Sequence, residues 1–522
     1  MTRRARLAIL AVPVAFLLLF FVFPFVSIVW EGLASDRSAV GRVLGETRVR
    51  DVIRFTFWQA TLSTALTLAV GLPIAFVVSR SALRGRAALA AFVVVPFVLP
   101  TVVVGMAFSG LSGSLAAILA AHVFFNVAVV VRVVGAAWAT IDPALEDAAE
   151  ELGAAGWRRV TGVLLPLASP AMVSAATLVF LFTFTSFGVI LLLGGAGQTT
   201  IEVEIFRRTS QQLDLSAAAV LALIQLVFVG ALLTADAVLA SRRRVAHAPV
   251  EPAPRMPRTR GERTFAVVVA ICALALVVLP LWRLVRRSLT GPEGITLANY
   301  LHIGEGRRGG VFEIVPGAAI WTSVRTAAIA AVIALAIGGL VSIGIALGAR
   351  SRGVWAVVAV PLGVSAVTLG FGYVVAFDTS PLDLRGSPWL VPLAQALVAM
   401  PFVVRIVAPA LAAAHASLGE SAAALGASPW RALRDATLPA CAGAVRTAAL
   451  FAFVVALGEF GATAFLARAD SPTIPVAIAR LLGQPGSASI GQASALAVIL
   501  MVLTAGAALA IGRVRIGSFG RI

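Results

Sequence analysis

The chain has 522 residues, of which 60% are hydrophobic and 12% charged, and its mean hydropathy is +0.99. No soluble core can bury so large an apolar fraction, so these values exclude a soluble globular protein and indicate an integral membrane protein. The net charge of +17 comes from arginines scattered over many short loops, with no lysine in the chain, and this distribution argues against nucleic-acid binding.

Apolar runs of membrane-spanning length follow one another along the chain. A helix needs about 20 residues to cross about 30 Å of hydrocarbon. Twelve runs meet this length: 7–30, 54–78, 87–109, 114–136, 168–193, 215–240, 264–282, 318–347, 354–377, 389–411, 441–466 and 490–511. Their composition, rich in Ala, Val, Leu, Gly and Pro without alternation of period two, predicts helices rather than an outer-membrane barrel. The predicted fold is all-α, with about 12 transmembrane helices.

The first run could be taken for a signal peptide, because MTRRAR gives it a positive start. Its apolar core, LAILAVPVAFLLLFFVFPFVSIVW, is longer than the roughly 7–15 residues of a signal h-region, and no clear small-x-small cleavage site follows. We expect this run to be retained as a membrane span, which is equivalent to an uncleaved signal anchor.

Arginines in the short loops predict the orientation of the chain, because cytoplasmic loops are enriched in them. With the N-terminus inside, the inner segments are 79–86, 241–263, 348–353 and the two ends of the chain, and all of them are basic. Three arginines oppose this arrangement, since they would lie at the outer end of the seventh span. They are Arg283, Arg286 and Arg287. The other loops outweigh them, and we expect both termini in the cytoplasm.

Two similar charged segments interrupt the apolar runs, EDAAEELGAAGWRRVTGVLLP at 146–166 and ESAAALGASPWRALRDATLP at 420–439. Gly426 follows Gly153 by 273 residues, and several other pairs share this spacing. The pairs are Trp157 and Trp430, Pro166 and Pro439, Arg132 and Arg405, Phe187-Gly188 and Phe460-Gly461, Thr200-Ile201 and Thr473-Ile474, and Arg207 and Arg480.

This duplication, with an even number of spans in each copy, predicts two parallel six-helix repeats. The expected organisation is a first half at 1–240, a basic, Pro-rich cytoplasmic linker at 241–263, and a second half at 264–522.

Each charged segment predicts two short helices that meet at an angle. In the first copy, alanines and acids favour a helix with Asp147, Glu150 and Glu151 on a wet face, and Gly153 supplies the break. Pro166 stands where proline is tolerated, in the first turn of the next helix. A helix lying flat among lipid headgroups is the alternative, but it does not explain the recurrence at matched positions. A symmetric pair of protruding loops suggests a two-fold partner.

The repeated pattern E-A-A-x3-G-x9-hydrophobic-x-L-P resembles the cytoplasmic signature of permease subunits of binding-protein-dependent ABC importers. The matching residues are Asp147, Ala148, Ala149, Gly153, Val163, Leu165 and Pro166 in the first half, and Glu420, Ser421, Ala422, Gly426, Ala436, Leu438 and Pro439 in the second. Asp147 replaces the usual Glu and Ser421 the central Ala, changes that preserve charge or size. The resemblance covers nearly the whole chain.

In that family the signature forms coupling helices that sit in clefts of two cytoplasmic ATPase subunits. The resemblance implies coupling loops at 139–167 and 412–440, in which Asp147 and Glu420 meet basic residues and Trp157 and Trp430 are apolar anchors. It also implies two copies of a cytoplasmic ABC ATPase and an extracytoplasmic solute-binding protein as partners. The location implied is multi-pass in the lipid bilayer of a bacterial cytoplasmic (inner) membrane.

The chain itself is expected to be a transport subunit rather than an enzyme, with no cofactor of its own. A P-loop requires lysine in G-x4-G-K-[ST], and this sequence has none, so ATP and Mg would be bound by the partner subunits. Cys272 and Cys441 lie in different halves, and the four histidines are dispersed without ligand spacing, so no metal site is expected.

Polar residues within or beside the spans are candidates for the pathway. For Glu459, contact with cargo and a structural role are equally acceptable readings. For His122 and Asn126, hydrogen bonding between helices is preferred over contact with cargo. Glu202 and Glu204 lie in an outer loop that either touches the binding protein or is simply solvated.

The cargo follows from a finer resemblance. The chain has the length of a fused double permease, and it resembles the group that includes thiamine and ferric-iron importer permeases. The motifs that carry this resemblance lie in the first half and are VVVPFVLPTVVVGMAF, HVFFN and TTIEVEI. Both cargoes are cations that outer acidic residues would suit, and the first-half motifs favour thiamine slightly. Sulfate, molybdate and polyamine permeases are more distant alternatives. An ion-coupled secondary transporter is another, although it gives no reason for twin protruding loops.

Overall fold

The computed structural model describes residues 3–35, 38–154, 156–242, 259–291, 294–304, 315–348, 364–378 and 382–519. Within these ranges the chain is helical apart from loops and one small hairpin, formed by β1 (Thr290–Gly291) and β2 (Gly294–Ile295). The all-α prediction is confirmed. We call residues 3–242 the first half and residues 259–519 the second half.

The helices of the two halves follow in a similar order. The first half contains α1 (Arg3–Leu17), α2 (Phe23–Trp30), α3 (Ala39–Gly45), α4 (Thr47–Arg80), α5 (Arg86–Val98), α6 (Thr101–Phe108), α7 (Leu115–Ala139), α8 (Pro143–Glu151), α9 (Trp157–Arg159), α10 (Leu165–Phe184), α11 (Gly188–Leu193), α12 (Ile201–Arg207) and α13 (Leu215–Arg242). The second contains α14 (Arg260–Ser288), α15 (Ala298–Leu301), α16 (Pro316–Ala346), α18 (Ala366–Ala376), α19 (Leu390–Ala414), α20 (Glu420–Ala424), α21 (Pro429–Arg431), α22 (Leu438–Ala440), α23 (Ala442–Gly458), α24 (Thr463–Leu466), α25 (Ile474–Leu482) and α26 (Ser487–Phe519).

Among the described residues, nine helices are long and apolar enough to cross a membrane, and two bent helix pairs raise the number to as many as eleven. The predicted run at 87–109 is one of these pairs, because α5 and α6 meet at 98°. Leu99 precedes Pro100 and takes an extended conformation, as residues before proline do, which ends α5. Of the predicted run at 354–377, residues 354–363 lie outside the described ranges and the remainder contains the short helix α18.

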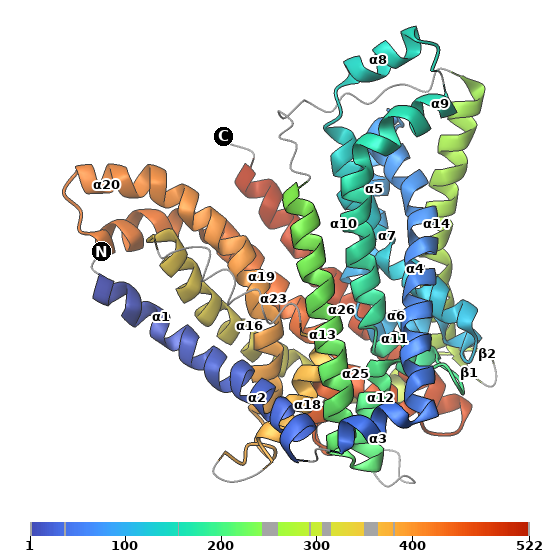
Figure 1. Cartoon of the computed structure of the whole chain (residues 1–522), viewed down its shortest axis with the longest axis vertical. Coiled ribbons are helices and arrows are strands. Elements are labelled where there is room, and N and C mark those ends of the chain that lie inside the picture. The colour runs from blue at the N-terminus through green and yellow to red at the C-terminus, as the bar shows by residue number, and fades with distance from the viewer. Residues whose placement is uncertain are drawn as a thin grey trace.

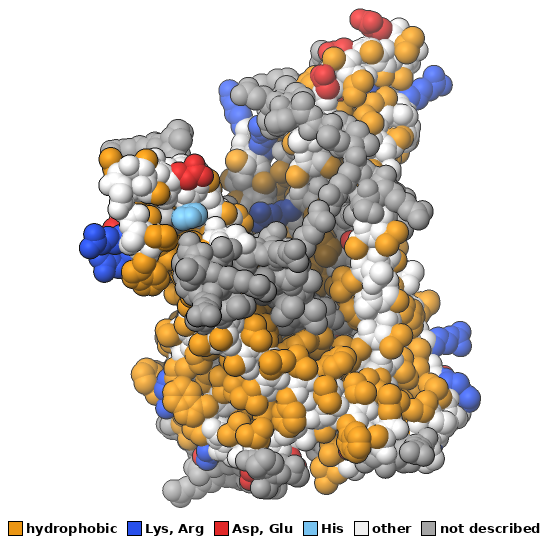
Figure 2. Space-filling view, turned by 60° about the vertical axis from the view of Figure 1, so that its left-hand side comes forward, with side chains coloured by type: hydrophobic (Ala, Val, Ile, Leu, Met, Phe, Trp, Pro, Cys, Tyr) orange, Lys and Arg blue, Asp and Glu red, His pale blue; other side chains and the backbone are white. Residues whose placement is uncertain are grey.

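The molecule has two distinct ends, shown in Figure 1. The short helices α8 and α20 project at one end, where α1 also begins, and α12, α18 and α25 lie toward the other (Figure 1). We call these the α8/α20 end and the α12/α25 end. Figure 2 shows hydrophobic side chains spread over the broad lower body, and acidic side chains gathered at the top of the protruding part. This distribution suits a body embedded in lipid with loops that reach into water.

Helix packing recurs between the halves. In the first half α10 packs against α4 and α7, and in the second half α23 packs against α16 and α19. A matched hydrogen bond fixes the start of the same short helix in each half: the Ile201 N–H donates to Thr56 Oγ1 at 3.0 Å, and the Ile474 N–H donates to Ser323 Oγ at 2.7 Å. The predicted linker at 241–263 is helical at its ends, and residues 243–258 lie outside the described ranges.

The first long helix of each half crosses to the other half. In the first half, α1 packs against α16 so closely that a Cβ on Gly344 would lie 2.7 Å from Leu10 Cδ2. In the second half, α14 packs against α4, α5 and α6 of the first half as well as against α26. The two halves are therefore interlocked by an exchange of helices, and a movement of one changes contacts in the other.

Candidate functional site

The first protruding loop turns at Gly153. Helix α8 begins with an N-cap, in which the Ala144 N–H donates to Asp142 Oδ1 at 2.9 Å. At its end, the Gly153 N–H donates to the Glu150 carbonyl at 3.0 Å and the Ala154 N–H to the Ala149 carbonyl at 2.8 Å. These two bonds define a Schellman motif, and Gly153 takes the left-handed conformation that the motif requires, with φ of +84°.

The second protruding loop repeats this motif bond for bond. The Gly426 N–H donates to the Ala423 carbonyl at 2.9 Å, and the Ala427 N–H donates to the Ala422 carbonyl at 3.0 Å. Gly426 has φ of +83°. The matched glycines are thus explained by matched backbone geometry, because only glycine adopts this conformation without a steric penalty.

Two apolar side chains are exposed at each of these turns. Leu152 and Leu425, which precede the glycines, are 88% and 90% exposed, and Trp157 and Trp430 are 72% and 56% exposed. Large side chains so fully exposed at a tip away from the apolar body are typical of a protein interface. The sequence pattern predicts a role for the tryptophans but not for the leucines, although the Leu-Gly pair recurs at the same spacing.

The remaining signature residues lie around these tips. Asp147 and Ala148 are exposed on α8, whereas Ala149 is buried. In the second loop Glu420 and Ser421 are exposed and Ala422 is half-buried. Both prolines are exposed in the first turn of a helix, Pro166 at the start of α10 and Pro439 in α22.

Ion pairs tie the first loop to the membrane body. Glu146, on the inner face of α8, is buried and pairs with Arg80 at the end of α4 and with Arg159, whose Nε lies 3.3 Å from Glu146 Oε2. Arg159 also pairs with Glu150. Arg80 Nη1 donates to the carbonyls of Trp138 and Ile141 at 3.0 and 3.2 Å. This network joins α8 to α4, to the end of α7 and to the segment that leads into α10.

The second loop is held by packing instead. Gly419 stands where the repeat spacing places Glu146, and it is buried beneath His415, whose Nδ1 would lie 2.5 Å from a Cβ at this glycine. Ala432, at the position that corresponds to Arg159, is buried next to the buried Leu433. Two short π-helical segments, His415–Gly419 and Ala432–Thr437, pack against each other here. The loops thus share their tips but not their attachment.

The halves meet at a pair of equivalent phenylalanines near the α12/α25 end. Phe187 and Phe460 are buried and stack with ring centroids 5.2 Å apart. Each is followed by a glycine that lets helices approach closely: a Cβ on Gly188 would lie 2.6 Å from Thr101 Oγ1, and one on Gly461 would lie 2.8 Å from the Cβ of Ala366. The phenylalanines of the repeated Phe-Gly pair therefore form a contact between the halves, and the glycines allow close packing within each half.

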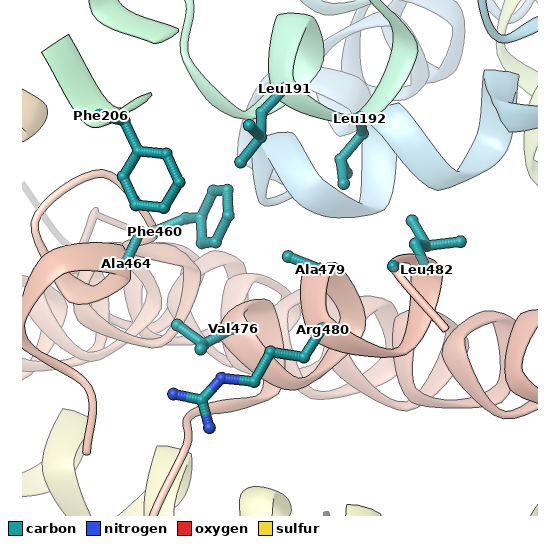
Figure 3. A pocket seen from close by; sticks show the side chains of 10 residues that line it. Leu191, Leu192, Phe206, Phe460, Ala464, Val476, Ala479, Arg480 and Leu482 are labelled. Carbon is teal, nitrogen blue, oxygen red and sulfur yellow. The ribbon is translucent and has the colours of Figure 1, made fainter. Parts of the chain in front are cut away.

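A cavity of about 400 Å³ lies beside this stack, lined by residues of both halves. Figure 3 shows the rings of Phe206 and Phe460 close together, and Leu191 and Leu192 across from Ala479 and Leu482. Arg480 is the one charged residue in the lining. Its guanidinium donates to three backbone carbonyls, those of Ala467, Arg468 and Ala469, at 3.1–3.4 Å.

Glu459, a candidate pathway residue, directly precedes Phe460 of the stack in sequence. Glu459 is buried and accepts hydrogen bonds at the start of α24, from the Ala462 N–H at 2.7 Å and the Thr463 N–H at 3.0 Å. The repeat spacing matches it to Ser186, whose hydroxyl lies 2.9 Å from His122 Nε2.

The other nitrogen of His122 also has a partner, since Ser63 Oγ lies 2.9 Å from Nδ1. His122 thus links α4 to the break between α10 and α11. Asn126 Nδ2 donates to the His122 carbonyl at 3.0 Å. Both residues are buried. These contacts fit the structural reading of the two side chains.

The two outer acidic residues are also buried and bonded within the chain. Glu204 pairs with Arg48 and with Arg208, at 3.1 and 3.2 Å. Glu202 bonds to Gln225 of α13 and to Ser365 at the start of α18, and burial raises the pKa of this carboxyl to about 7. Contact of either residue with cargo would therefore require these bonds to open.

The described part of the chain contains no group of three or more His, Cys, Asp and Glu side chains that could hold a metal ion.

The ion-pair network around Glu146 is not predicted by the sequence. The one indication in the sequence is the position of Glu146 three residues before Ala149, which puts both on the same face of a helix. Both residues are buried in the structure. Arg80 lay in a basic loop segment and was interpreted only as a marker of orientation.

Comparison with known proteins places these features in context. Residues 68–245 match the family described as binding-protein-dependent transport system inner membrane component. The thiamine transport system permease protein of Salmonella typhimurium is 26% identical over 494 residues, 87% of this chain and 87% of that protein. Its counterpart in Escherichia coli is 26% identical over 91% of each chain.

A further relative matches half of the chain. The putative 2-aminoethylphosphonate transport system permease protein of Salmonella typhimurium is 28% identical over 257 residues, which are 47% of this chain and 91% of that protein. The longer relatives thus span both halves, as this chain does, and the shorter one spans a single half.

Proposed function

Because this chain is a permease subunit of the binding-protein-dependent ABC importers, located in the inner membrane, we propose that its two halves form the translocation pathway for thiamine. A binding protein delivers the cargo at the α12/α25 end, and two copies of an ATPase bind at the α8/α20 end. The termini and both protruding loops then lie in the cytoplasm.

The observation that carries this proposal is the bond-for-bond match of the two Schellman turns, each with an exposed Leu and Trp at its tip. Two identical ATPase subunits present the same cleft twice, so they require two tips of the same shape. The tips agree in backbone geometry and apolar side chains even though their attachment to the body differs.

Closure of the ATPase pair draws the two tips together. The first loop transmits this movement through Glu146 and its arginines to α4 and α10. The second transmits it through the packed π-helical segments to α19 and α23. Since the halves meet at Phe187 and Phe460 at the opposite end, their relative rotation opens or closes this contact beside the cavity.

Similarity to thiamine permeases over 87% and 91% of this chain supports thiamine as the cargo. Charge does not decide between cargoes, because the three acidic candidates, Glu202, Glu204 and Glu459, are bonded within the chain. Ferric iron and 2-aminoethylphosphonate are therefore the competitors against which thiamine is to be tested.

The test is purification of the chain, tagged at its C-terminus, in mild detergent from its own host, followed by mass spectrometry of the proteins that co-purify. We expect an ATPase with a Walker motif and a solute-binding protein. Calorimetry of that binding protein with thiamine, Fe(III) and 2-aminoethylphosphonate then identifies the cargo. Failure to recover an ATPase, even after cross-linking from cysteines introduced at Leu152 or Leu425, would overturn the coupling role.

A further inference from the structure

Three arginines at the end of α14 line a second cavity, of about 330 Å³, at the α12/α25 end. They are Arg283, Arg286 and Arg287, the residues that oppose the expected orientation. The opposite wall comes from the first half and includes Phe108 and Leu111. Arg287 Nη1 also donates to Ser109 Oγ at 2.6 Å, which fixes one guanidinium at the edge of this wall.

The positive charge of this cavity is not balanced within the described part of the chain, where none of the three arginines forms an ion pair. Nearby arginines at the same end behave differently, since Arg48 and Arg208 both pair with Glu204. Like charges three and four residues apart on a helix repel each other. The favourable helix dipole explains a basic residue at the end of α14, but not three around a cavity.

The cavity lies at the lipid-facing side of the molecule. Helix α14 exposes a continuous apolar face that includes Ile271 and Leu279, and this face ends at Trp282, which is 60% exposed. Tryptophan is enriched at the level of the lipid headgroups, where its ring is partly apolar and partly wet. Arg283 directly follows Trp282 in sequence, and Arg286 and Arg287 lie within the next turn and a half of the same helix, so the three arginines lie at headgroup depth.

Basic pockets between transmembrane helices bind anionic lipid headgroups. We propose that this cavity binds the phosphate of an anionic phospholipid, with the guanidinium groups on the phosphate and Phe108 and Leu111 against the apolar part of the headgroup. That the lipid belongs to the outer leaflet rests on the orientation in the proposed function. The bound lipid bridges α14 of the second half and the end of α6 in the first half. A lipid headgroup and free inorganic phosphate would both present a phosphate anion to this cavity. We assign the anion to a lipid because an apolar helix face leads to the pocket.

The test uses the full chain with its co-purifying subunits, and native mass spectrometry to measure binding of phosphatidylglycerol and phosphatidylethanolamine. We expect preferential binding of phosphatidylglycerol, and loss of the preference in the triple variant Arg283→Gln/Arg286→Gln/Arg287→Gln. At about fivefold per arginine near a membrane surface, the loss of affinity is on the order of a hundredfold. Replacing the same three residues with lysine should retain most of the binding, which separates loss of charge from misfolding.

The matched control is Arg50→Gln/Arg54→Gln, two exposed arginines at the same end of the molecule but outside the cavity. Equal phosphatidylglycerol binding by the triple variant and this control would overturn the proposal. Arginine-dependent binding of inorganic phosphate without a preference for phosphatidylglycerol would assign the site to a free anion and overturn the lipid source. Because lipid binding is measured without transport, it can fail while the importer function stands, and the reverse also holds.

Discussion

Replacing Glu146 by glutamine should loosen the first coupling loop while leaving the second unchanged. Glu146 is the shared partner of Arg80 and Arg159, and the side chains of Glu146 and Arg80 are only 3% and 6% exposed. The substitution keeps the size of the side chain but removes its charge. Arg80 then remains buried without the Glu146 carboxylate, while its bonds to backbone carbonyls persist.

The magnitude follows from what each arginine keeps. Removing one partner of a buried ion pair typically costs about 3–5 kcal/mol. Arg159 retains Glu150, and Arg80 retains two carbonyls, so we expect the lower end, about 3 kcal/mol. At 1.36 kcal/mol per factor of ten, this raises the population of the open loop roughly a hundredfold.

The assay is hydrogen exchange of the backbone amides in α8 and the segment up to α10, measured in the full chain. The control is Glu420→Gln, since Glu420 is exposed in the second loop and its substitution should change stability by less than about 0.5 kcal/mol. The double variant Arg80→Gln/Glu146→Gln should recover part of the protection, because it also removes the buried charge at position 80. Exchange in Glu146→Gln no faster than in Glu420→Gln would refute the role of the network.

Other predictions concern the tips and the outer acid. Gly153→Val should cost about 1–2 kcal/mol of loop stability, because φ of +84° is unfavourable for a β-branched residue. This variant should reduce ATP-driven uptake without preventing membrane insertion, and normal uptake would contradict the prediction. Leu152→Ala and Leu425→Ala should each weaken ATPase binding by about tenfold or more in a pull-down titration. The control variant Val227→Ala, which changes an exposed residue of α13, should leave ATPase binding unchanged. Burial raises the pKa of Glu202 to about 7, so the stability contributed by its protonated form is present below pH 4.5 and is lost as the pH rises through 7. Thermal unfolding of Glu202→Gln should lack this component, and identical pH profiles would count against it.

Hydropathy and repetition were sufficient to predict the helical class, the protruding loops and the turns at Gly153 and Gly426. These features depend on local properties, namely the length of apolar runs and the tolerance of glycine for positive φ. The bend between α5 and α6 was also within reach, because Pro100 interrupts the run. It was overlooked since hydropathy alone does not register a change of direction.

Contacts between distant segments could not be predicted in the same way. Nothing in the sequence around Glu204 indicates Arg48 as its partner, 156 residues away, so sequence alone leaves the acid in an outer loop that either touches the binding protein or is solvated. The exchange of α1 and α14 between the halves likewise depends on packing of whole helices. The repeat spacing pairs Glu459 with Ser186 by position alone, and only the fold shows that backbone N–H groups donate to the Glu459 carboxylate.

The stack of Phe187 on Phe460 is a contact of a residue with its own counterpart, as occurs on the axis that relates two copies. In a dimer of identical chains, any mutation at such a position appears on both sides at once, and only matched pairs can be tested by selection. A single chain with both copies is free of this restriction. One side can become smaller, polar or charged while the other keeps its ring, so the seal between the halves can evolve into an asymmetric opening in single steps.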